Sequence, residues 1–192
     1  MSLSPLIAGS LAAALLAAVT VWAFAHLPGI WVWAAFVGWA SYDQSGANRK
    51  ALLTSSACMV LGVVMAWLVA LVVAGNLLPL SSAVASAVAA GVASFIIVYL
   101  SRFMPFGNVP ATFYGFASSF AFLLMHSASF SMSAMSALDL NNVLLCVSIS
   151  LLIGSVLGII HQRLAYFLTD SARRPATPAA TRLTPAKQEP HR

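Results

Sequence analysis

Long apolar runs, separated by short stretches that carry proline, glycine or charge, constrain this chain more than any other feature. A helix rises about 1.5 Å per residue and the hydrocarbon core of a bilayer is about 30 Å thick, so one crossing needs roughly 20 mostly apolar residues. Only 7% of the residues are charged, whereas a soluble domain carries about 25%. The sequence therefore predicts an all-α, polytopic membrane helix bundle. Its six predicted transmembrane helices span 5–25, 30–43, 50–74, 81–101, 109–127 and 142–168.

The second run, 30–43, is the shortest of the six. At 1.5 Å per residue it extends only about 21 Å, which is less than the thickness of the hydrocarbon core. Three interpretations stay open: a tilted helix, a helix that begins near Pro28, or a partial crossing that lines a cavity.

The positions of lysine and arginine predict the orientation of these helices. Cytoplasmic loops and helix ends are enriched in both residues, a bias known as the positive-inside rule. If the N-terminus is cytoplasmic, all nine Lys and Arg residues fall on the cytoplasmic side, in or beside loops 44–49 and 102–108 or near the C-terminal end. The opposite loops, 26–29, 75–80 and 128–141, contain neither residue. We therefore expect six crossings with both termini in the cytoplasm.

The crossings leave no room for a second, soluble domain, so we assign residues 1–170 to one transmembrane domain. Residues 171–192 differ, because they hold five of the nine cations and four prolines. Such a segment cannot bury enough apolar surface to offset its ordering entropy. We expect a disordered basic cytoplasmic tail, and weak attachment to the anionic inner leaflet is its alternative role. The net charge of +5 therefore does not indicate nucleic-acid binding.

One short sequence motif occurs in two similar copies, "FVGWAS" at 36–41 and "FYGFAS" at 113–118. A shift of 77 residues extends this match, since 28–41 and 105–118 are identical at seven of fourteen positions. Identity alone does not establish duplication in a chain so rich in small and aliphatic residues. The order of crossings, proline-marked loops and central glycines is also the same in both halves, which favours a true repeat.

The repeat divides the transmembrane domain into halves at about 5–74 and 81–168. Each half has three crossings, an odd number, so the second half starts from the opposite side of the membrane. We therefore expect a three-plus-three inverted repeat, whose halves are related by a pseudo-two-fold axis in the membrane plane. The glycines that the repeat aligns are predicted to pack helices, because small residues let membrane helices approach closely. A pore-lining role is the alternative for these residues, which are Gly38, Gly62, Gly115 and Gly154.

Inverted repeats often place a path or site between the halves, near the midplane of the membrane. No Asp, Glu, Lys or Arg lies near the centre of a predicted crossing, which favours a passive pathway over a proton- or sodium-coupled carrier. We expect a channel or transporter for a small neutral or weakly polar solute. Asn108 is also placed to cap the helix that follows it. The predicted lining residues are Trp39, Ser41, Asn108, Thr112, Tyr114 and Ser118.

The alternative function is that of a non-transporting membrane scaffold or partner subunit of a membrane complex, and the sequence is compatible with a homo-oligomer. A continuous polar cavity between the halves would favour transport, whereas a dry interface packed by Gly38 and Gly115 would favour the scaffold. The chain has no catalytic constellation, and Cys58 and Cys146 lie inside apolar runs without metal-ligand or disulfide spacing. We therefore expect neither an enzyme nor a bound metal or cofactor.

Several of these stretches together resemble a known family. They are Pro28, "WVWAAFVGWASYDQSG" (31–46), Gly62 in the following crossing and "NVPATFYGFASSFAF" (108–122). With these motifs the chain resembles the bacterial inner-membrane domain-of-unknown-function family 1097 over about residues 8–168. The resemblance implies a multi-pass protein of the bacterial inner membrane. It implies no activity and no functional residues.

Overall fold

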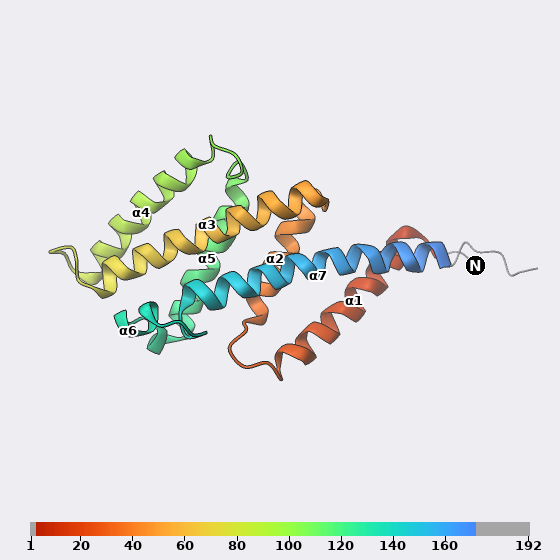
Figure 1. Ribbon diagram of the computed structural model, residues 1–192, viewed down its shortest axis with the longest axis horizontal. Helices are drawn as coiled ribbons and strands as arrows, with labels where there is room; N and C mark the ends of the chain where they lie inside the picture. Colours follow the sequence, from red (N-terminus) through yellow and green to blue (C-terminus); the bar gives the residue numbers. More distant parts are fainter. Residues whose placement is uncertain (1–2, 172–192) are drawn as a thin grey trace, which may run out of the picture.

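The computed structural model describes residues 3–171, and all regular structure in this range is helical (Figure 1). The helices are α1 (Pro5–Phe24), α2 (Val32–Gln44), α3 (Arg49–Ala74), α4 (Ser82–Leu100), α5 (Val109–Met125), the short 3₁₀ helix η1 (Ser127–Ser129), α6 (Met132–Ser136) and α7 (Val143–Ser171). The prediction of an all-α fold is therefore confirmed. The predicted tail, 171–192, lies outside the described residues except for Ser171.

Each of the six predicted crossings coincides with one helix, although the lengths differ. Four helices, α1, α3, α4 and α7, are long and apolar enough to cross a membrane. Helix α5 is apolar but has 17 residues, and α2 has only 13. Helix α2 is short because the chain before Val32, which includes Pro28, forms turns and extended backbone. Complete crossings by α2 and α5 therefore stay predictions.

Local sequence sets where several helices begin. Ser4 Oγ accepts a hydrogen bond from the backbone N–H of Ile7, and Asn48 Oδ1 accepts one from Ala51. Asn108 caps α5 in the same way, as the sequence predicted. A proline also stands in the first turn of α1 and of α5, where its missing N–H is not needed.

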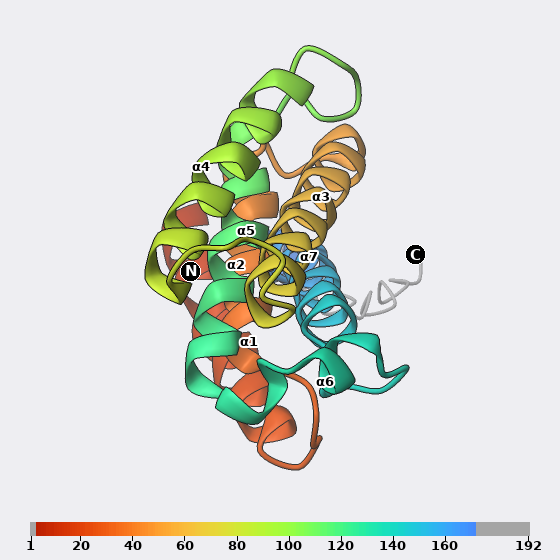
Figure 2. The same cartoon turned by 90° about the vertical axis from the view of Figure 1, so that its left-hand side faces the viewer.

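Helices α3 and α7 lie side by side and antiparallel; they run across the middle of the view in Figure 1 and lie to the right of α2 and α5 in Figure 2. Helix α2 packs against α7 and α5 against α3, while α1 lies beside α7 and α4 beside α3. In Figure 1 the connections 25–31, 75–81 and 126–142 lie toward the left and bottom, and the connections 45–48 and 101–108 lie toward the top and right. Successive connections thus alternate between two opposite sides of the bundle.

Large apolar side chains cover the outside of the bundle, and small ones fill much of its inside. On α1, Leu6 and Trp22 are 79% and 68% exposed, whereas Ala8 and Ala12 are fully buried. On α4, Phe95 is 70% exposed. A water-soluble protein rarely exposes a continuous apolar surface of this kind. This surface is suited to lipid.

One helix crossing brings the backbones of α2 and α7 into direct contact. A methyl group added to Gly38 would overlap the carbonyl of Leu151, and one added to Gly154 would overlap the carbonyl of Ala35. The two helices can approach this closely because neither glycine has a side chain. Each glycine therefore makes room for the backbone of the opposite helix.

A second crossing has the same arrangement between α3 and α5. Gly62 faces the carbonyl of Thr112, and Gly115 faces the carbonyl of Met59, again with no room for a methyl group. The structure thus places all four predicted packing glycines at two crossings. Each crossing joins a helix of the first predicted half to a helix of the second.

The connection 128–141, which the sequence predicts as a loop, contains helix α6 and packs onto the bundle. The hydroxyl of Ser131 caps the first turn of α6. Met135 is fully buried, and its carbonyl accepts hydrogen bonds from Trp67 Nε1 at 3.0 Å and from Asn142 Nδ2 at 2.9 Å. Five helical residues are too few to give a periodic pattern, so the sequence did not predict this helix.

We predict that Gly62→Ala destabilises the folded protein by about 1–3 kcal/mol or more, because the added methyl group meets backbone that cannot move aside. Gly9→Ala is the matched control, since nothing lies within 4 Å of a methyl group added at Gly9 in α1. This change should be neutral or stabilising by up to about 1 kcal/mol, owing to the helix propensity of alanine. The free energy of unfolding in mixed detergent micelles measures both effects. Equal stability of the two variants would contradict the close crossing.

Candidate functional site

The predicted lining residues lie on or directly beside α2 and α5. These two short helices are antiparallel, so the beginning of each lies next to the end of the other. At one end, Asn108 stands before α5 and Ser45 stands just after α2. Asn108 Oδ1 accepts a hydrogen bond from the N–H of Ala111 at 3.2 Å, and its Nδ2 donates to Ser45 Oγ at 2.8 Å. The cap that starts α5 therefore also ties it to the end of α2.

The other ends of the two helices meet through aromatic rings. Trp31, just before α2, packs edge-on against Phe122 near the end of α5, with ring centroids 5.7 Å apart. His126 stacks on Phe122 at 4.5 Å. The backbone N–H of Trp31 donates to Ser150 Oγ of α7 at 2.9 Å. This end of the helix pair is held mainly by apolar contact.

Ser41 joins α2 to α3. Its Oγ lies 2.7 Å from Ser55 Oγ, and both residues are fully buried. The carbonyl of Ser41 accepts a hydrogen bond from Ser45 Oγ at 2.6 Å. Together with the Asn108–Ser45 bond, these contacts form a polar network that connects α2, α3 and α5.

Three other predicted residues lie along α5. Thr112 Oγ1 donates to the carbonyl of Asn108 at 3.3 Å. The Tyr114 hydroxyl donates to Gln44 Oε1, near the end of α2. Ser118 is buried on the same helix. Four of the six predicted residues, Ser41, Asn108, Thr112 and Tyr114, therefore lie at contacts among α2, α3 and α5.

Trp39 instead faces α7 and α1. Its ring lies 5.1 Å from that of His161 on α7 and stacks on Phe36 at 6.1 Å. His161 Nε2 is 3.2 Å from the carbonyl oxygen of Gly9, and Nδ1 is 3.8 Å from Asp43 Oδ2. This histidine therefore links α1, α2 and α7.

The sequence analysis did not identify His161. A single histidine inside an apolar run is a weak signal, and its partners on α1 and α2 are far away in the sequence. The available signal was the polar stretch His161, Gln162 and Arg163, which interrupts the last apolar run.

The buried part of the interface between α2, α3 and α5 is dry, whereas Asn108 and Tyr114 are partly exposed. Side chains that line a water-filled path keep surface accessible to water, but Ser41, Thr112 and Ser118 are only 0%, 1% and 2% exposed. The hydroxyls of Ser41 and Thr112 find hydrogen-bond partners inside the bundle instead.

Two hollows of the described structure lie at its periphery. One, of about 430 Å³, is bounded mainly by apolar side chains of α3, α4 and α5 together with Ser127 and Phe130. Another, of about 300 Å³, lies between α1 and α2, and Trp39 and Asp43 line it. Neither hollow runs between α2 and α5.

The described residues contain no cluster of three or more His, Cys, Asp or Glu side chains that could hold a metal ion. Both described cysteines are buried and free. Cys58 Sγ donates to the carbonyl of Pro105 at 3.5 Å, and Cys146 Sγ donates to that of Gly29 at 3.3 Å. The thiols thus bond to the segments that precede α5 and α2.

An all-helical body with an apolar outer surface and several helices long enough to span a bilayer defines a multi-pass membrane protein. The chain belongs to the family described as Protein of unknown function (DUF1097), whose sequence profile matches residues 10–166. This match confirms the family that the sequence motifs indicated. No curated protein and no solved structure matches the chain.

We predict that Ser41→Ala and Ser55→Ala are coupled in their effects on stability. Each single change leaves one buried hydroxyl without its partner, whereas the double change removes both groups. The coupling energy in a double-mutant cycle should be about 0.6–1.7 kcal/mol, the range of hydrogen bonds between membrane helices. The free energy of unfolding of the four proteins measures it. Strictly additive effects would show that the two hydroxyls do not interact.

Proposed function

We propose that the chain is built from two inverted halves, α1 to α3 and α4 to α7. The glycine crossings support this proposal. Helix α2 crosses α7 at Gly38 and Gly154, and α5 crosses α3 at Gly115 and Gly62. Because the repeat aligns Gly38 with Gly115 and Gly62 with Gly154, each crossing is the counterpart of the other.

A second pair of contacts supports the same symmetry. Asn108 bonds to Ser45 at one end of the α2–α5 pair, and Trp31 packs on Phe122 at the other. Asn108 follows Trp31 by 77 residues, and Phe122 follows Ser45 by the same separation. The two contacts are therefore equivalent under the sequence shift, although one is polar and the other is aromatic.

The same arrangement supports six crossings with both ends of the helical body on one side of the membrane. We propose that this membrane is the bacterial inner membrane and that this side is the cytoplasm, on the basis of the positions of lysine and arginine. Successive connections alternate between two sides of the bundle (Figure 1). Extended backbone before α2 and α5 would complete the spans of these short helices, provided that its polar groups have partners. The thiols of Cys146 and Cys58 supply such partners to the carbonyls of Gly29 and Pro105.

The function that this geometry supports best is that of a non-transporting partner subunit in a membrane assembly. The dry interface between the halves carries this proposal. Ser41 and Ser118 have almost no surface accessible to water. At Gly38 and Gly115 the backbone of the opposite helix is in direct contact, which leaves no space between the helices there. A protein without a path through its own helices acts through its outer faces.

Helix α4 has an outer face that suits association with another helix. Ala83, Ala87 and Gly91 recur at every fourth residue, and all three are exposed. A glycine inside a helix lowers the stability of the helix by about 1 kcal/mol relative to alanine. No close contact within the protein requires a glycine at position 91. Small residues on a lipid-facing helix let a second helix approach closely. A second copy of this chain is the simplest partner.

A pathway for a small neutral or weakly polar solute is the second candidate function. The inverted halves favour it, because channels and transporters use this symmetry. The polar network of Asn108, Ser45, Ser41 and Ser55 also lies between the halves. A solute would pass only if α5 separated from α2 and the Asn108–Ser45 hydrogen bond opened.

We predict that Gly91→Leu weakens association of the protein in membranes by on the order of tenfold, because the larger side chain would overpack the helix contact. Val21→Leu is the control, since Val21 is an exposed residue on a different helix, α1, and already has a branched side chain. Cross-linking in membranes and native mass spectrometry measure the assembly and the mass of the partner. A monomeric wild-type protein without a co-purifying partner would contradict the proposal.

Solute flux into liposomes distinguishes the two candidate functions. We predict that the purified protein gives no more flux than empty liposomes for a panel of small neutral and weakly polar solutes, because the interface between its halves is closed. A solute-specific flux that falls when Ser41 and Ser118 are each changed to Leu would overturn the partner-subunit proposal and establish the pathway. The thermal midpoint of each variant serves as the control for folding.

A further inference from the structure

A pocket of about 390 Å³ lies where α2 ends, α3 begins and α7 passes both. It is on the side of the 45–48 connection, which the orientation prediction places in the cytoplasm. Leu52 and Ile159 contribute apolar walls. Its polar lining residues are Tyr42, Asn48, Arg49, Gln162, Arg163 and Tyr166.

Two arginines from different helices line this pocket. Arg49 is the first residue of α3, and Arg163 lies in the last third of α7. Among the side chains that the structure describes, neither arginine is within ion-pair distance of a carboxylate. Asp43 lies instead beside His161 and lines the hollow between α1 and α2. The lining residues that the structure describes therefore carry two positive charges and no negative one.

Neutral groups of the pocket also favour an anion, because they can donate hydrogen bonds to it. The Tyr42 hydroxyl donates to Gln162 Oε1 at 3.1 Å, which leaves the amide N–H groups of Gln162 free to donate. Helix α3 begins at the pocket, and the first N–H groups of a helix carry partial positive charge. Asn48 caps the N–H of Ala51, so earlier N–H groups of this turn are left for water or a ligand.

We propose that this pocket binds a phosphate group through Arg49 and Arg163. Guanidinium groups hold phosphate oxygens by paired, charge-assisted hydrogen bonds, and a helix N-terminus favours the same charge. The phosphate belongs to the headgroup of an anionic phospholipid in the adjoining leaflet or to a soluble phosphate. Both sources present the same oxygens to the arginines. Basic pockets between helices on the cytoplasmic side are typical sites for lipid headgroups.

The test uses the full chain purified in a neutral detergent. The protein is titrated with short-chain phosphatidylglycerol, with zwitterionic phosphatidylcholine for comparison, and with inorganic phosphate. Native mass spectrometry counts bound lipid, and the shift in thermal midpoint reports both kinds of probe. We expect saturable binding of an anionic phosphate probe, and Arg49→Gln and Arg163→Gln should each weaken it by on the order of tenfold.

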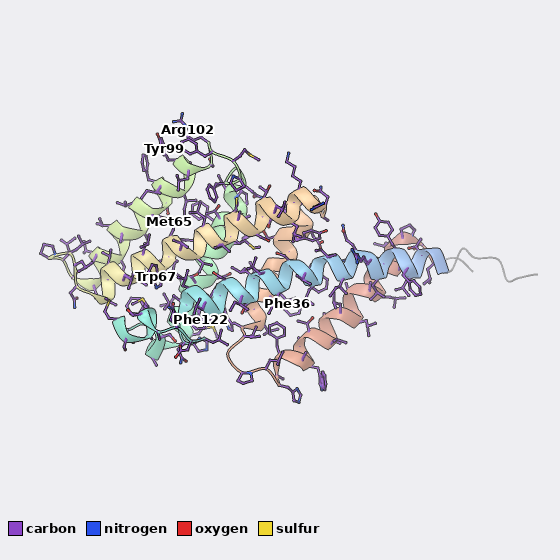
Figure 3. All side chains as sticks on the ribbon, viewed as in Figure 1. Phe36, Met65, Trp67, Tyr99, Arg102 and Phe122 are labelled. Atoms are coloured by element: carbon purple, nitrogen blue, oxygen red, sulfur yellow. The ribbon has the colours of Figure 1, made fainter. Side chains whose placement is uncertain are left out.

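Arg102→Gln is the matched control. Arg102 is on the same predicted side of the membrane but lies against the rings of Tyr99 and Phe103, at 5.4 and 5.2 Å from their centroids, outside the pocket (Figure 3). This variant should change affinity by less than about twofold, because only a specific site depends on particular arginines. Thermal midpoints without a probe check that every variant folds.

The outcomes separate the two sources of phosphate and can overturn the site. Binding of phosphatidylglycerol that depends on both pocket arginines and that inorganic phosphate does not displace assigns the pocket to a lipid headgroup, whereas binding unchanged by Arg49→Gln and Arg163→Gln would overturn the site. Binding of inorganic phosphate that depends on both pocket arginines assigns it to a soluble phosphate. An equal loss of affinity in Arg102→Gln, or no saturable binding of either anionic probe, would overturn the proposal.

Discussion

Close approach of helix backbones at two glycine crossings is the constraint on which the rest of this structure depends. Lipid tails are as apolar as the side chains that face them, so apolar burial drives membrane helices together only weakly and close packing must hold them. At Gly38 and Gly154, and again at Gly62 and Gly115, a carbonyl of the opposite helix occupies the space of a side chain. The crossings join α2 to α7 and α5 to α3, and α3 and α7 in turn lie side by side in one helical body.

The closeness of the helices decides what their polar side chains can do. Without water between the helices, a polar group must find its partner inside the bundle. Ser41 pairs with Ser55, and Asn108 pairs with Ser45, so both pairs hold helices together. Polarity on a membrane helix is therefore not by itself a sign of a water-filled path. The charged side chain of Arg49 lies instead at the edge of the bundle, where a pocket exposes it.

Most of the helical body could be predicted, because each apolar run forms a helix and Asn108 begins α5 as a cap. Helix α6 could not, since its five residues depend on the burial of Met135 and on hydrogen bonds from Trp67. The candidate site was predicted in part. Polar residues on α2 and α5 were identified, but nothing local pairs Asn108 with Ser45, which is 63 residues away. His161 stayed unrecognised because its contacts lie on other helices.

The sequence by itself determined that this chain belongs in lipid, that it is helical and which family it belongs to, and it predicted four glycines as candidates for close helix contacts. These properties follow from hydropathy and residue size in short windows of sequence. Only the tertiary structure decided that Gly38 meets Leu151, that Gly115 meets Met59, and that the residues between the halves bond to each other instead of lining water. The physical reason is that such contacts depend on how all the helices pack together, and no local pattern encodes that packing.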